Sequence, residues 1–406
     1  MFGKRDTDVL VVGAGPVGLL TALQLEKRGV RVEIYDKDWR TAAHSYGLAL
    51  HGHSLALLDE VGVLPELLEE GRKVLRMEFH DADGKKAEID FSRLGGDYPF
   101  VLALAQSAIE DSLENRLREK HIPVHWNHRV QTLADDGTRV LVDVAKLDKV
   151  STGYPVARME WEVTGTVRVR ASYVAGADGY HSLARRALDI DFADRGGLES
   201  FAVFEFEMTE DPGDAARVYL HDHGTDVFWP MKDGRCRWNF HVDSVGEDRV
   251  PSLEELHRLL KTRAPGFPLP EKLYWSSFVM FDRRVAESYG RGRIRLAGDA
   301  AHLTGPVGAQ SMNVGLDEAC DLAERLAGII RDDAPSELLD TYGEARRADW
   351  LDILGETGAP KPGAECSEWV ASRAGGILPC VPASGADLDA LLGQLGLAAV
   401  RTQAGV

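Results

Sequence analysis

Residues 7–36 constrain the fold of this 406-residue chain more than any other stretch. An apolar run that ends at Val12 predicts a β-strand. Three glycines follow at the spacing Gly-x-Gly-x-x-Gly, as Gly13, Gly15 and Gly18, and they open a leucine-rich stretch that predicts a helix. A second apolar run then predicts another strand. This order of strand, glycine turn, helix and strand predicts a parallel βαβ unit, and hence an α/β fold of the Rossmann type.

The same stretch predicts a nucleotide ligand. Gly13 permits the tight turn, Gly15 lets the backbone approach a pyrophosphate, and Gly18 permits close packing of the helix on the strand. Asp36 closes the second strand 23 positions after Gly13, where an acid accepts a hydrogen bond from a ribose hydroxyl. A glycine-rich turn without a ligand is the alternative. We expect a dinucleotide site that also includes Pro16.

A second acid, Asp299, also follows an expected strand. Residues 293–297 alternate basic and aliphatic side chains, which predicts a strand that ends at Gly298. Open α/β sheets bind ligands at the carboxyl ends of their strands. A helix expected to begin near residues 311–313 points its free amides and its positive dipole end at the same place. An acid for hydroxyl groups beside a helix end for negative charge suits the ribityl chain and the pyrimidine ring of a flavin.

A third strand-to-helix junction lies at residues 176–185. Asp178 and Gly179 follow an expected strand, and Ser182 and Arg185 lie at the start of the expected helix. The loop amides and the cation would serve a dinucleotide that the first glycine loop already holds. An ordinary capped helix start explains the same residues equally well.

Gln106 lies at another expected strand-to-helix junction, where Ser107 and Glu110 form a capping box. The Gln106 side chain either reaches the cofactor or faces solvent. The spacing alone does not separate these two interpretations.

From about residue 191 to residue 282 the alternation of strands and helices stops. Apolar runs separated by turn signals predict a mostly antiparallel sheet, which we expect to cover the reactive end of the cofactor and to form the substrate pocket. Core packing explains each candidate for this pocket at least as well, and none stands out as a catalytic base. The candidates are Tyr219, His221, His223, Trp229, Trp238, Phe240 and His241. His221 and His223 lack a third ligand at a suitable spacing, so no metal site is expected.

The amino-acid composition limits which classes of partner and which cellular location we expect for the protein. Acidic residues outnumber basic ones by 65 to 47, and the net charge of −18 argues against nucleic acid or an anionic membrane as a main partner. The four cysteines have no metal-ligand or redox spacing, which predicts reduced thiols in a cytoplasmic protein. Glycines interrupt the first apolar run, so it predicts neither a signal peptide nor a membrane span. A monomer and a homodimer are equally compatible with the sequence.

Three motifs in this order resemble those of the p-hydroxybenzoate hydroxylase-like FAD-dependent monooxygenases, the single-component aromatic hydroxylases. The motifs are Gly13-x-Gly15-x-x-Gly18 with Asp36, then Gly176-Ala-Asp178-Gly179 with Ser182 and Arg185, then Gly298-Asp299-Ala-Ala-His302 with Pro306, Gly308, Met312 and Asn313. The resemblance extends over roughly residues 7–350. It implies a FAD-binding domain like that of glutathione reductase, with an inserted substrate domain.

The resemblance also implies roles for these residues. The first motif and Asp36 would hold the ADP half of FAD. Asp178 would lie near the pyrophosphate, in a motif that the family links to NAD(P)H. Asp299 would bond the ribityl chain, and the amides around Met312 and Asn313 would face the pyrimidine edge of the flavin.

Further cofactor contacts are implied at Gln106, Gly298, Pro306 and Gly308. The chain departs from the family pattern at two places. Tyr46 and its neighbours stand where the family often has a basic residue that helps to hold pyrophosphate or NADPH. Ser311 stands where glycine is common, and a side chain there would alter how the isoalloxazine sits or moves.

The resemblance and the chain organisation together predict the domains. The FAD-binding domain is discontinuous and spans residues 1–75, 98–190 and 283–355. The substrate domain spans residues 76–97 and 191–282. Residues 356–406 are expected to form a C-terminal irregular segment with one short helix.

The function implied by the resemblance is that of an enzyme. It would use NAD(P)H and O₂ to hydroxylate an aromatic or polyketide-like small molecule of secondary metabolism, through a flavin C4a-hydroperoxide. An epoxidase or a Baeyer–Villiger oxygenase on the same scaffold is one alternative. A non-catalytic FAD-binding module is the other.

Overall fold

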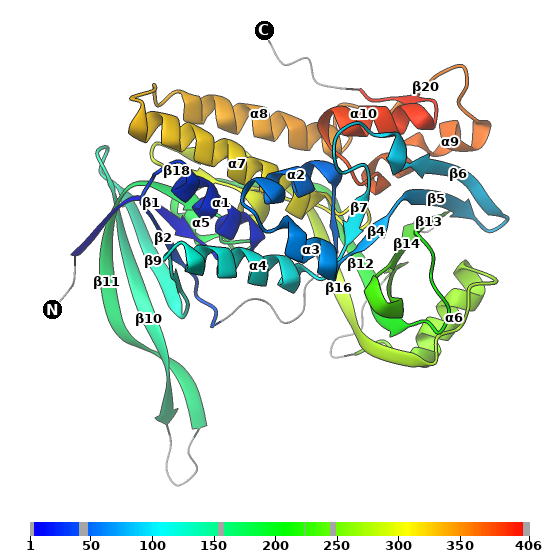
Figure 1. Ribbon diagram of the computed structural model, residues 1–406, viewed down its shortest axis with the longest axis horizontal. Helices are drawn as coiled ribbons and strands as arrows, with labels where there is room; N and C mark the ends of the chain where they lie inside the picture. Colours follow the sequence, from blue (N-terminus) through cyan, green and yellow to red (C-terminus); the bar gives the residue numbers. More distant parts are fainter. Residues whose placement is uncertain (1–3, 40–47, 153–157, 223, 244–248, 401–406) are drawn as a thin grey trace.

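The computed structural model describes residues 4–39, 48–152, 158–222, 224–243 and 249–400. Two eight-stranded sheets dominate this described part, and helices lie around them (Figure 1). The first sheet has a parallel centre and the second is mostly antiparallel. The predicted α/β class with an inserted antiparallel sheet is therefore confirmed.

The first sheet carries the glycine motif at its centre. It consists of β1 (Lys4–Val12), β2 (Val32–Tyr35), β8 (Val124–His125), β9 (His128–Asp135), β10 (Val140–Thr152), β11 (Arg158–Gly176), β17 (Gly290–Arg291) and β18 (Ile294–Leu296). β1 pairs in parallel with β2 and β11, and β11 pairs in parallel with β18. The last four residues of β1 are apolar and buried on both faces, since Val9, Leu10 and Val11 have no exposed surface.

Helices pack on this sheet and on one another, and together with the sheet they form what is called the first half below. They are α1 (Pro16–Lys27), α2 (Gly52–Glu60), α3 (Leu64–Glu70), α4 (Gln106–Glu119), α5 (Leu183–Ala187), α7 (Gln310–Arg331) and α8 (Leu338–Ile353). α1 contacts both α4 and α7, and α8 lies along α7 (Figure 1). A small sheet of β3 (Ala49–Leu50), β4 (Arg72–Val74) and β7 (Val101–Ala103) joins this half to the second sheet.

The second sheet has two different faces. Its strands, in spatial order, are β19 (His302–Leu303), β16 (Lys272–Ala286), β12 (Phe192–Glu207), β15 (Arg235–Val242), β14 (Gly224–Pro230), β13 (Ala215–His221), β5 (Arg76–Asp81) and β6 (Gly84–Asp90). One face packs on α6 (Leu253–Arg263). The other face packs toward the turn at Val307 and toward the C-terminal segment. This second face, called the inner face below, is the one that meets the first half.

The C-terminal segment differs from the prediction. Instead of one short helix, it contains α9 (Glu368–Ile377), the 3-10 turn η4 (Leu378–Cys380), α10 (Gly385–Gln394) and a pair of short strands, β20 (Lys361–Pro362) and β21 (Leu397–Ala398). Val370, Ala374 and Ile377 form the buried side of α9. The sequence pattern does not predict this helix, because glycine and serine residues surround its three apolar positions.

No helix in the described ranges combines the length and the apolar composition that a membrane crossing requires.

Candidate functional site

Three neighbouring strands of the first sheet end side by side. Val12 of β1 is opposite Gly176 of β11, and Gly176 is opposite Leu296 of β18. The first sequence motif begins directly after Val12, the second begins at Gly176 itself, and the third begins two residues after Leu296. The parallel pairing therefore brings segments that are more than a hundred residues apart in sequence to one edge of the sheet, where α/β folds bind ligands.

The first glycine loop has the geometry that its spacing predicts. Gly13 has φ +100°, and a side chain there would meet the carbonyl oxygen of Ala177 at 2.2 Å. A side chain at Gly18 would meet the carbonyl oxygen of Gly13 at 2.0 Å. A side chain at Gly15 would meet nothing within 4 Å. Gly13 and Gly18 therefore permit close packing, whereas Gly15 leaves open space.

A cleft of about 630 Å³ lies at this edge. Residues from all three motifs line it, and so do three cations, Lys37, Arg129 and Arg186. The predicted site residues in its lining are Gly13, Gly15, Pro16, Asp36, Gln106, Asp178, Asp299 and Met312. The predicted site residues outside its described lining are Gly18, Gly298, Pro306, Gly308 and Asn313.

Asp36 closes the first motif. Its carboxylate accepts the backbone N–H of Ala14 at 2.6 Å and that of Asp38 at 2.8 Å. Burial raises the pKa of Asp36, and the two backbone bonds oppose this shift. Each carboxylate oxygen has a second lone pair, so Asp36 holds the glycine loop to the end of β2 and can still accept a ligand hydroxyl from the cleft.

Asp299 differs from the two other predicted acids of the cleft, Asp36 and Asp178. Its side chain is exposed, and no described residue hydrogen-bonds to its carboxylate. The solvent that contacts this side chain is that of the cleft, and protein surrounds the carboxylate on its other sides. Burial raises its pKa, His302 lowers it and Glu318 raises it further. An unpaired carboxylate in a cleft is suited to accept hydroxyl groups of a ligand.

Asp178 serves the fold and borders the cleft at the same time. Its carboxylate accepts the Ser182 hydroxyl at 2.5 Å and the backbone N–H groups of Leu183 and Ala184 at 2.6 and 3.1 Å. Ser182 in turn accepts the backbone N–H of Arg185 at 2.9 Å. The interpretation as a capped helix start is therefore correct for these side chains. Its place in the cleft lining leaves the interpretation as a nucleotide contact open.

The cation expected from the second motif faces elsewhere. Arg185 is buried, and its guanidinium donates to the carbonyl oxygens of Ala300 and Tyr180, at 2.8 Å each. It also stacks over the ring of Phe192, 3.8 Å from the centroid. The prediction that Arg185 offers a charge to a dinucleotide is wrong, because the side chain connects the second motif to the third. Arg186 faces the cleft instead.

The helix that carries Gln106 starts earlier than its sequence suggested. α4 begins at Gln106 after Ala105, and no side chain caps it, so the predicted capping box of Ser107 and Glu110 is wrong. Glu110 is buried and accepts the Gln106 amide at 2.7 Å. This bond orients Gln106, which borders the cleft.

The start of α7 is held by side chains from distant segments. Asn313 donates its amide to the carbonyl oxygens of Ala49 at 2.8 Å and Ala309 at 2.7 Å, and it accepts the backbone N–H of His51 at 2.8 Å. The amide nitrogen and the amide oxygen of this buried side chain thus both make hydrogen bonds within the protein. Ser311 accepts the backbone N–H of Thr304 at 3.2 Å, so the residue that replaces the family's glycine steadies the preceding loop.

His51 was missed by the sequence analysis. Its Nε2 lies 3.0 Å from the carbonyl oxygen of Gly308, and burial lowers the pKa of His51 to about 3. The imidazole is therefore neutral near pH 7, and Nε2 carries the proton that it donates. The His51–Gly308 contact spans 257 positions of the chain, and no local pattern indicates it.

The aromatic and histidine candidates divide between the faces of the second sheet. Tyr219, Trp238 and Phe240 pack on the α6 side, away from the cleft, so they are core residues and not pocket residues. His221 lies on the same side, 3.2 Å from the buried carboxylate of Asp226. The predicted pocket role is therefore wrong for these four residues. The alternation of side chains along each strand separates the two faces.

Two candidates lie on the inner face. Trp229 is buried in the core that includes Val307, and the His241 ring packs edge-on against Phe201 at 5.4 Å. His223 lies outside the described residues, as does Tyr46. None of the described candidates from the second sheet is assigned as a catalytic base.

The inner face also carries polar residues that the sequence analysis missed. Arg237 is buried and donates its Nε to Glu205 at 2.9 Å. Asn239, two residues further along β15, is buried, and its Oδ1 has no hydrogen-bond partner among the described residues. Their signal was the alternation of polar and aromatic residues along residues 235–242.

Comparisons with known proteins agree with this geometry. A family model described as "FAD binding domain" matches residues 6–354. The para-nitrophenol 4-monooxygenase of Pseudomonas sp. (strain WBC-3) is 29% identical over 363 residues, which cover 86% of this chain and 85% of that protein. A rifampicin monooxygenase of Streptomyces venezuelae is 30% identical over 87% of this chain and 70% of that protein.

The architecture is shared with solved structures as well. The crystal structure of the p-nitrophenol 4-monooxygenase PnpA from Pseudomonas putida DLL-E4 matches with a TM-score of 0.76 and 26% identity, over 97% of both chains. The anhydrotetracycline hydroxylase OxyS from Streptomyces rimosus matches with a TM-score of 0.66 and 28% identity, over 86% of this chain and 67% of that one.

Proposed function

The chain belongs to the FAD binding domain family, in the group of flavoprotein aromatic hydroxylases, and from this membership we propose that it uses NAD(P)H and O₂ to hydroxylate an aromatic small molecule. One observation supports the proposal above the others. The free carboxylate of Asp299 lies in the same cleft as the open position of Gly15, because their strands end in register.

The residues present fit FAD. Gly15 leaves the space in which a pyrophosphate would lie, and Asp36 and Asp299 supply acceptors for the hydroxyl groups of the ribose and of the ribityl chain. We assign Gly13, Gly15, Pro16 and Asp36 to the ADP half. Gln106, Asp299 and the helix start at Met312 would then contact the flavin half.

Three residues from the predicted set act on the cofactor indirectly in this proposal. Gly298 and Gly308 permit close packing, since a side chain would meet Val17 at 2.9 Å at the first position and the Pro379 carbonyl at 2.5 Å at the second. Asn313 fixes the start of α7. Met312 alone of the Met312–Asn313 pair borders the cleft.

Bound FAD, once reduced, supplies the activation of O₂ and the transfer of one oxygen atom to the substrate. The chain supplies the rest: it orients the cofactor, and the inner face of the second sheet excludes water from the reacting ring. Trp229, Arg237, Asn239 and His241 are the inner-face residues that we propose around the substrate.

The substrate class rests on the relatives. Their names specify para-nitrophenol, rifampicin and anhydrotetracycline as the compounds those proteins act on. We propose an aromatic or polyketide-like substrate for this chain as well. The four cysteines are free thiols, which supports the proposed cytoplasmic location.

The test is substrate-stimulated oxidation of NAD(P)H by the FAD-loaded protein. A panel of phenols and polycyclic aromatic compounds should contain a member that accelerates NADH or NADPH consumption. Its product should carry one oxygen atom from ¹⁸O₂, on a ring carbon, as shown by mass spectrometry. An oxygen inserted as an epoxide or an ester would assign the alternative oxygenase reactions. A flavin-loaded protein that no panel member stimulates would instead indicate a non-catalytic FAD-binding module.

A further inference from the structure

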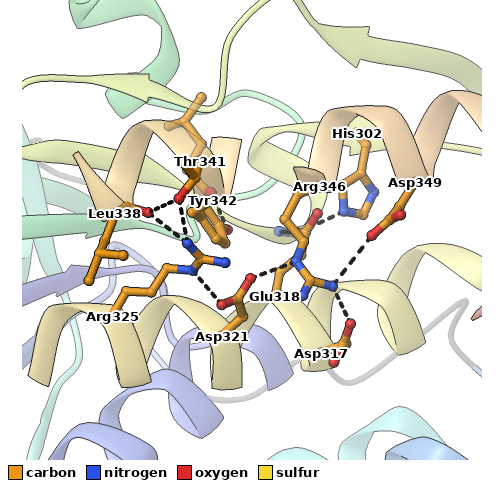
Figure 2. A network of polar contacts seen from close by, with 12 residues as sticks. His302, Asp317, Glu318, Asp321, Arg325, Leu338, Thr341, Tyr342, Arg346 and Asp349 are labelled. Atoms are coloured by element: carbon orange, nitrogen blue, oxygen red, sulfur yellow. Dashed lines mark hydrogen bonds and ion pairs between the residues drawn. The ribbon is translucent and has the colours of Figure 1, made fainter. Parts of the chain in front are cut away.

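One buried carboxylate makes hydrogen bonds to both ends of the stretch Gly298–His302 in the third motif. Glu318 of α7 has no exposed surface, and its Oε2 accepts the backbone N–H of Gly298 at 2.7 Å. The same oxygen accepts Nε2 of His302 at 2.9 Å. His302 must be the donor here, since the carboxylate only accepts. Figure 2 shows the Glu318 carboxylate and the His302 ring facing each other, joined by a dashed line.

The turn between these two bonds carries Asp299. Gly298 has φ +63°, and a side chain there would meet Val17 of the first motif at 2.9 Å. The carbonyl oxygen of Ala300 accepts the buried guanidinium of Arg185 at 2.8 Å. The backbone on both sides of Asp299 is therefore held by other residues, while no described residue holds the Asp299 carboxylate itself.

The buried surroundings of the Glu318–His302 pair impose a free-energy cost on it. The His302 ring stacks on Trp350 with its centroid 3.9 Å away. His302 Nδ1 and Trp350 Nε1 are buried without hydrogen-bond partners in the described part of the chain. Buried ion pairs are often replaced by apolar side chains of similar volume without loss of stability. Packing alone therefore does not explain a carboxylate at this position.

Neighbouring acids on the same helix have a different task. Asp321 accepts Arg346 Nε at 2.9 Å and Arg325 Nε at 2.5 Å, and Asp317 also pairs with Arg346 (Figure 2). These contacts join α7 to α8 and cover the Glu318–His302 pair. Asp321 therefore offers a matched control, since it is an acid of the same helix that does not contact the turn.

We propose that Glu318 and His302 are positioning residues for the cofactor: by holding Gly298 and residue 302 on one oxygen, they set the direction in which the Asp299 carboxylate enters the cleft. This inference rests on the proposed FAD site. It goes beyond it, because neither residue lines the cleft. The hydrogen bond to Gly298, rather than the charge of Glu318, is the essential part.

The experiment compares FAD binding and stability in the full chain. Apoprotein is titrated with FAD, and flavin fluorescence gives the dissociation constant, while thermal unfolding of the apoprotein gives its stability. Glu318→Met should weaken FAD binding ten- to a hundredfold, equivalent to about 1.4–2.7 kcal/mol. Glu318→Gln should restore it to within about threefold of the wild type, because its amide oxygen still accepts both hydrogen bonds. The visible circular dichroism of bound FAD should change in Glu318→Met and not in Glu318→Gln.

Asp321→Asn controls for stability alone. It should lower the unfolding temperature and leave FAD affinity unchanged. Should Glu318→Met not fold, His302→Phe takes its place, since it keeps a ring on Trp350 and removes the donor; it should also weaken FAD binding. FAD affinity equal to the wild type in Glu318→Met or His302→Phe would overturn the inference. A wild-type protein that binds no FAD would overturn the proposed function instead, before any variant is compared.

Discussion

Asp299 differs from Asp36 and Asp178, the other two predicted acids of the cleft, in the hydrogen bonds that its carboxylate already makes. Asp36 and Asp178 each accept backbone N–H groups of the protein. No described residue hydrogen-bonds to the Asp299 carboxylate. A ligand hydroxyl at Asp299 therefore displaces only water. Among the three acids, Asp299 is the one whose removal should affect ligand binding most directly and the fold least.

The first prediction concerns Asp299→Ala. A hydrogen bond to a charged acceptor contributes about 1.5–3 kcal/mol, so FAD should bind at least about tenfold more weakly. The variant should purify largely without flavin, which the ratio of visible to ultraviolet absorbance measures. Asp317→Asn, an acid of the α7–α8 contact, should purify with the flavin content of the wild type. A yellow and fully loaded Asp299→Ala protein would disprove the role assigned to Asp299.

The second prediction concerns the pH dependence of apoprotein stability. Burial raises the pKa of Asp299, so the folded state disfavours its ionised form. A raised pKa contributes stability at low pH that is lost as the pH rises through the folded-state value. Asp299→Asn should therefore unfold at a higher temperature than the wild type at pH 7. The difference should disappear near pH 4, where the unfolded-state carboxyl also becomes protonated. A gain that does not change with pH would contradict this account.

Local patterns predicted some of these residues and not others. Gly13, Gly15 and Asp36 follow from their spacing alone, because the turn, the open backbone and the acid belong to one continuous βαβ unit. Arg185 was assigned the wrong task, and the side-chain contacts of Asn313 were not predicted. Their hydrogen-bond partners lie 115 and 264 positions away. Such long-range contacts exist only once the sheet has formed.

At the scale of elements, the order and register of the strands determine where the three motifs meet. The sequence predicts each of the three strand ends but not their order in the sheet. The sheet has the parallel order β2, β1, β11, β18, and the chain forms β12 to β16 of the second sheet between the neighbouring strands β11 and β18 (Figure 1). The motifs converge because of this order. Their convergence was predicted only through the resemblance to a known family.

The contact between α7 and α8 gives the third prediction. Arg346 is largely buried and pairs with Asp317 and Asp321, and these pairings hold its pKa above the ordinary value although burial opposes them. Arg346→Met would remove the cation that Asp317 and Asp321 share, and Asp321 would keep only its pair with Arg325. Removing one partner of a buried pair costs about 3–5 kcal/mol, and solvent access to this pair reduces the expected loss to about 2–3 kcal/mol.

Urea unfolding of Arg346→Met measures this loss as a lower midpoint. The matched control is Arg118→Met on α4, whose partner is Glu114 four residues away and whose side chain is 70% exposed. Its loss should stay below about 1 kcal/mol. Equal losses in the two variants would show that the α7–α8 contact does not depend on the Arg346 pairs.

At the scale of the whole molecule, the C-terminal segment completes both halves. Its helices cover the inner face of the second sheet, where Ile377, Leu391 and Leu392 are fully buried. Its backbone also supports the turn at the start of α7. Gln310 donates its amide to the carbonyl oxygens of Val381 at 2.5 Å and Ala383 at 2.9 Å. The family match ends at residue 354, yet this turn depends on residues beyond that point.

The fourth prediction follows from this dependence. A chain ended after residue 354 exposes the inner face and leaves the buried amide of Gln310 without acceptors, at a cost of about 1–3 kcal/mol for the amide alone. It should lose cooperative thermal unfolding and bind FAD more weakly than the full chain. Leu391→Ala in the full chain is the graded variant. It should remain folded, lose about 2–5 kcal/mol of stability and keep its FAD affinity, because α10 contacts the second sheet and not the cleft. Circular dichroism and FAD titration test both. A shortened chain with the unfolding midpoint and FAD affinity of the full chain would show that residues 355–406 are an appendage to a fold complete without them.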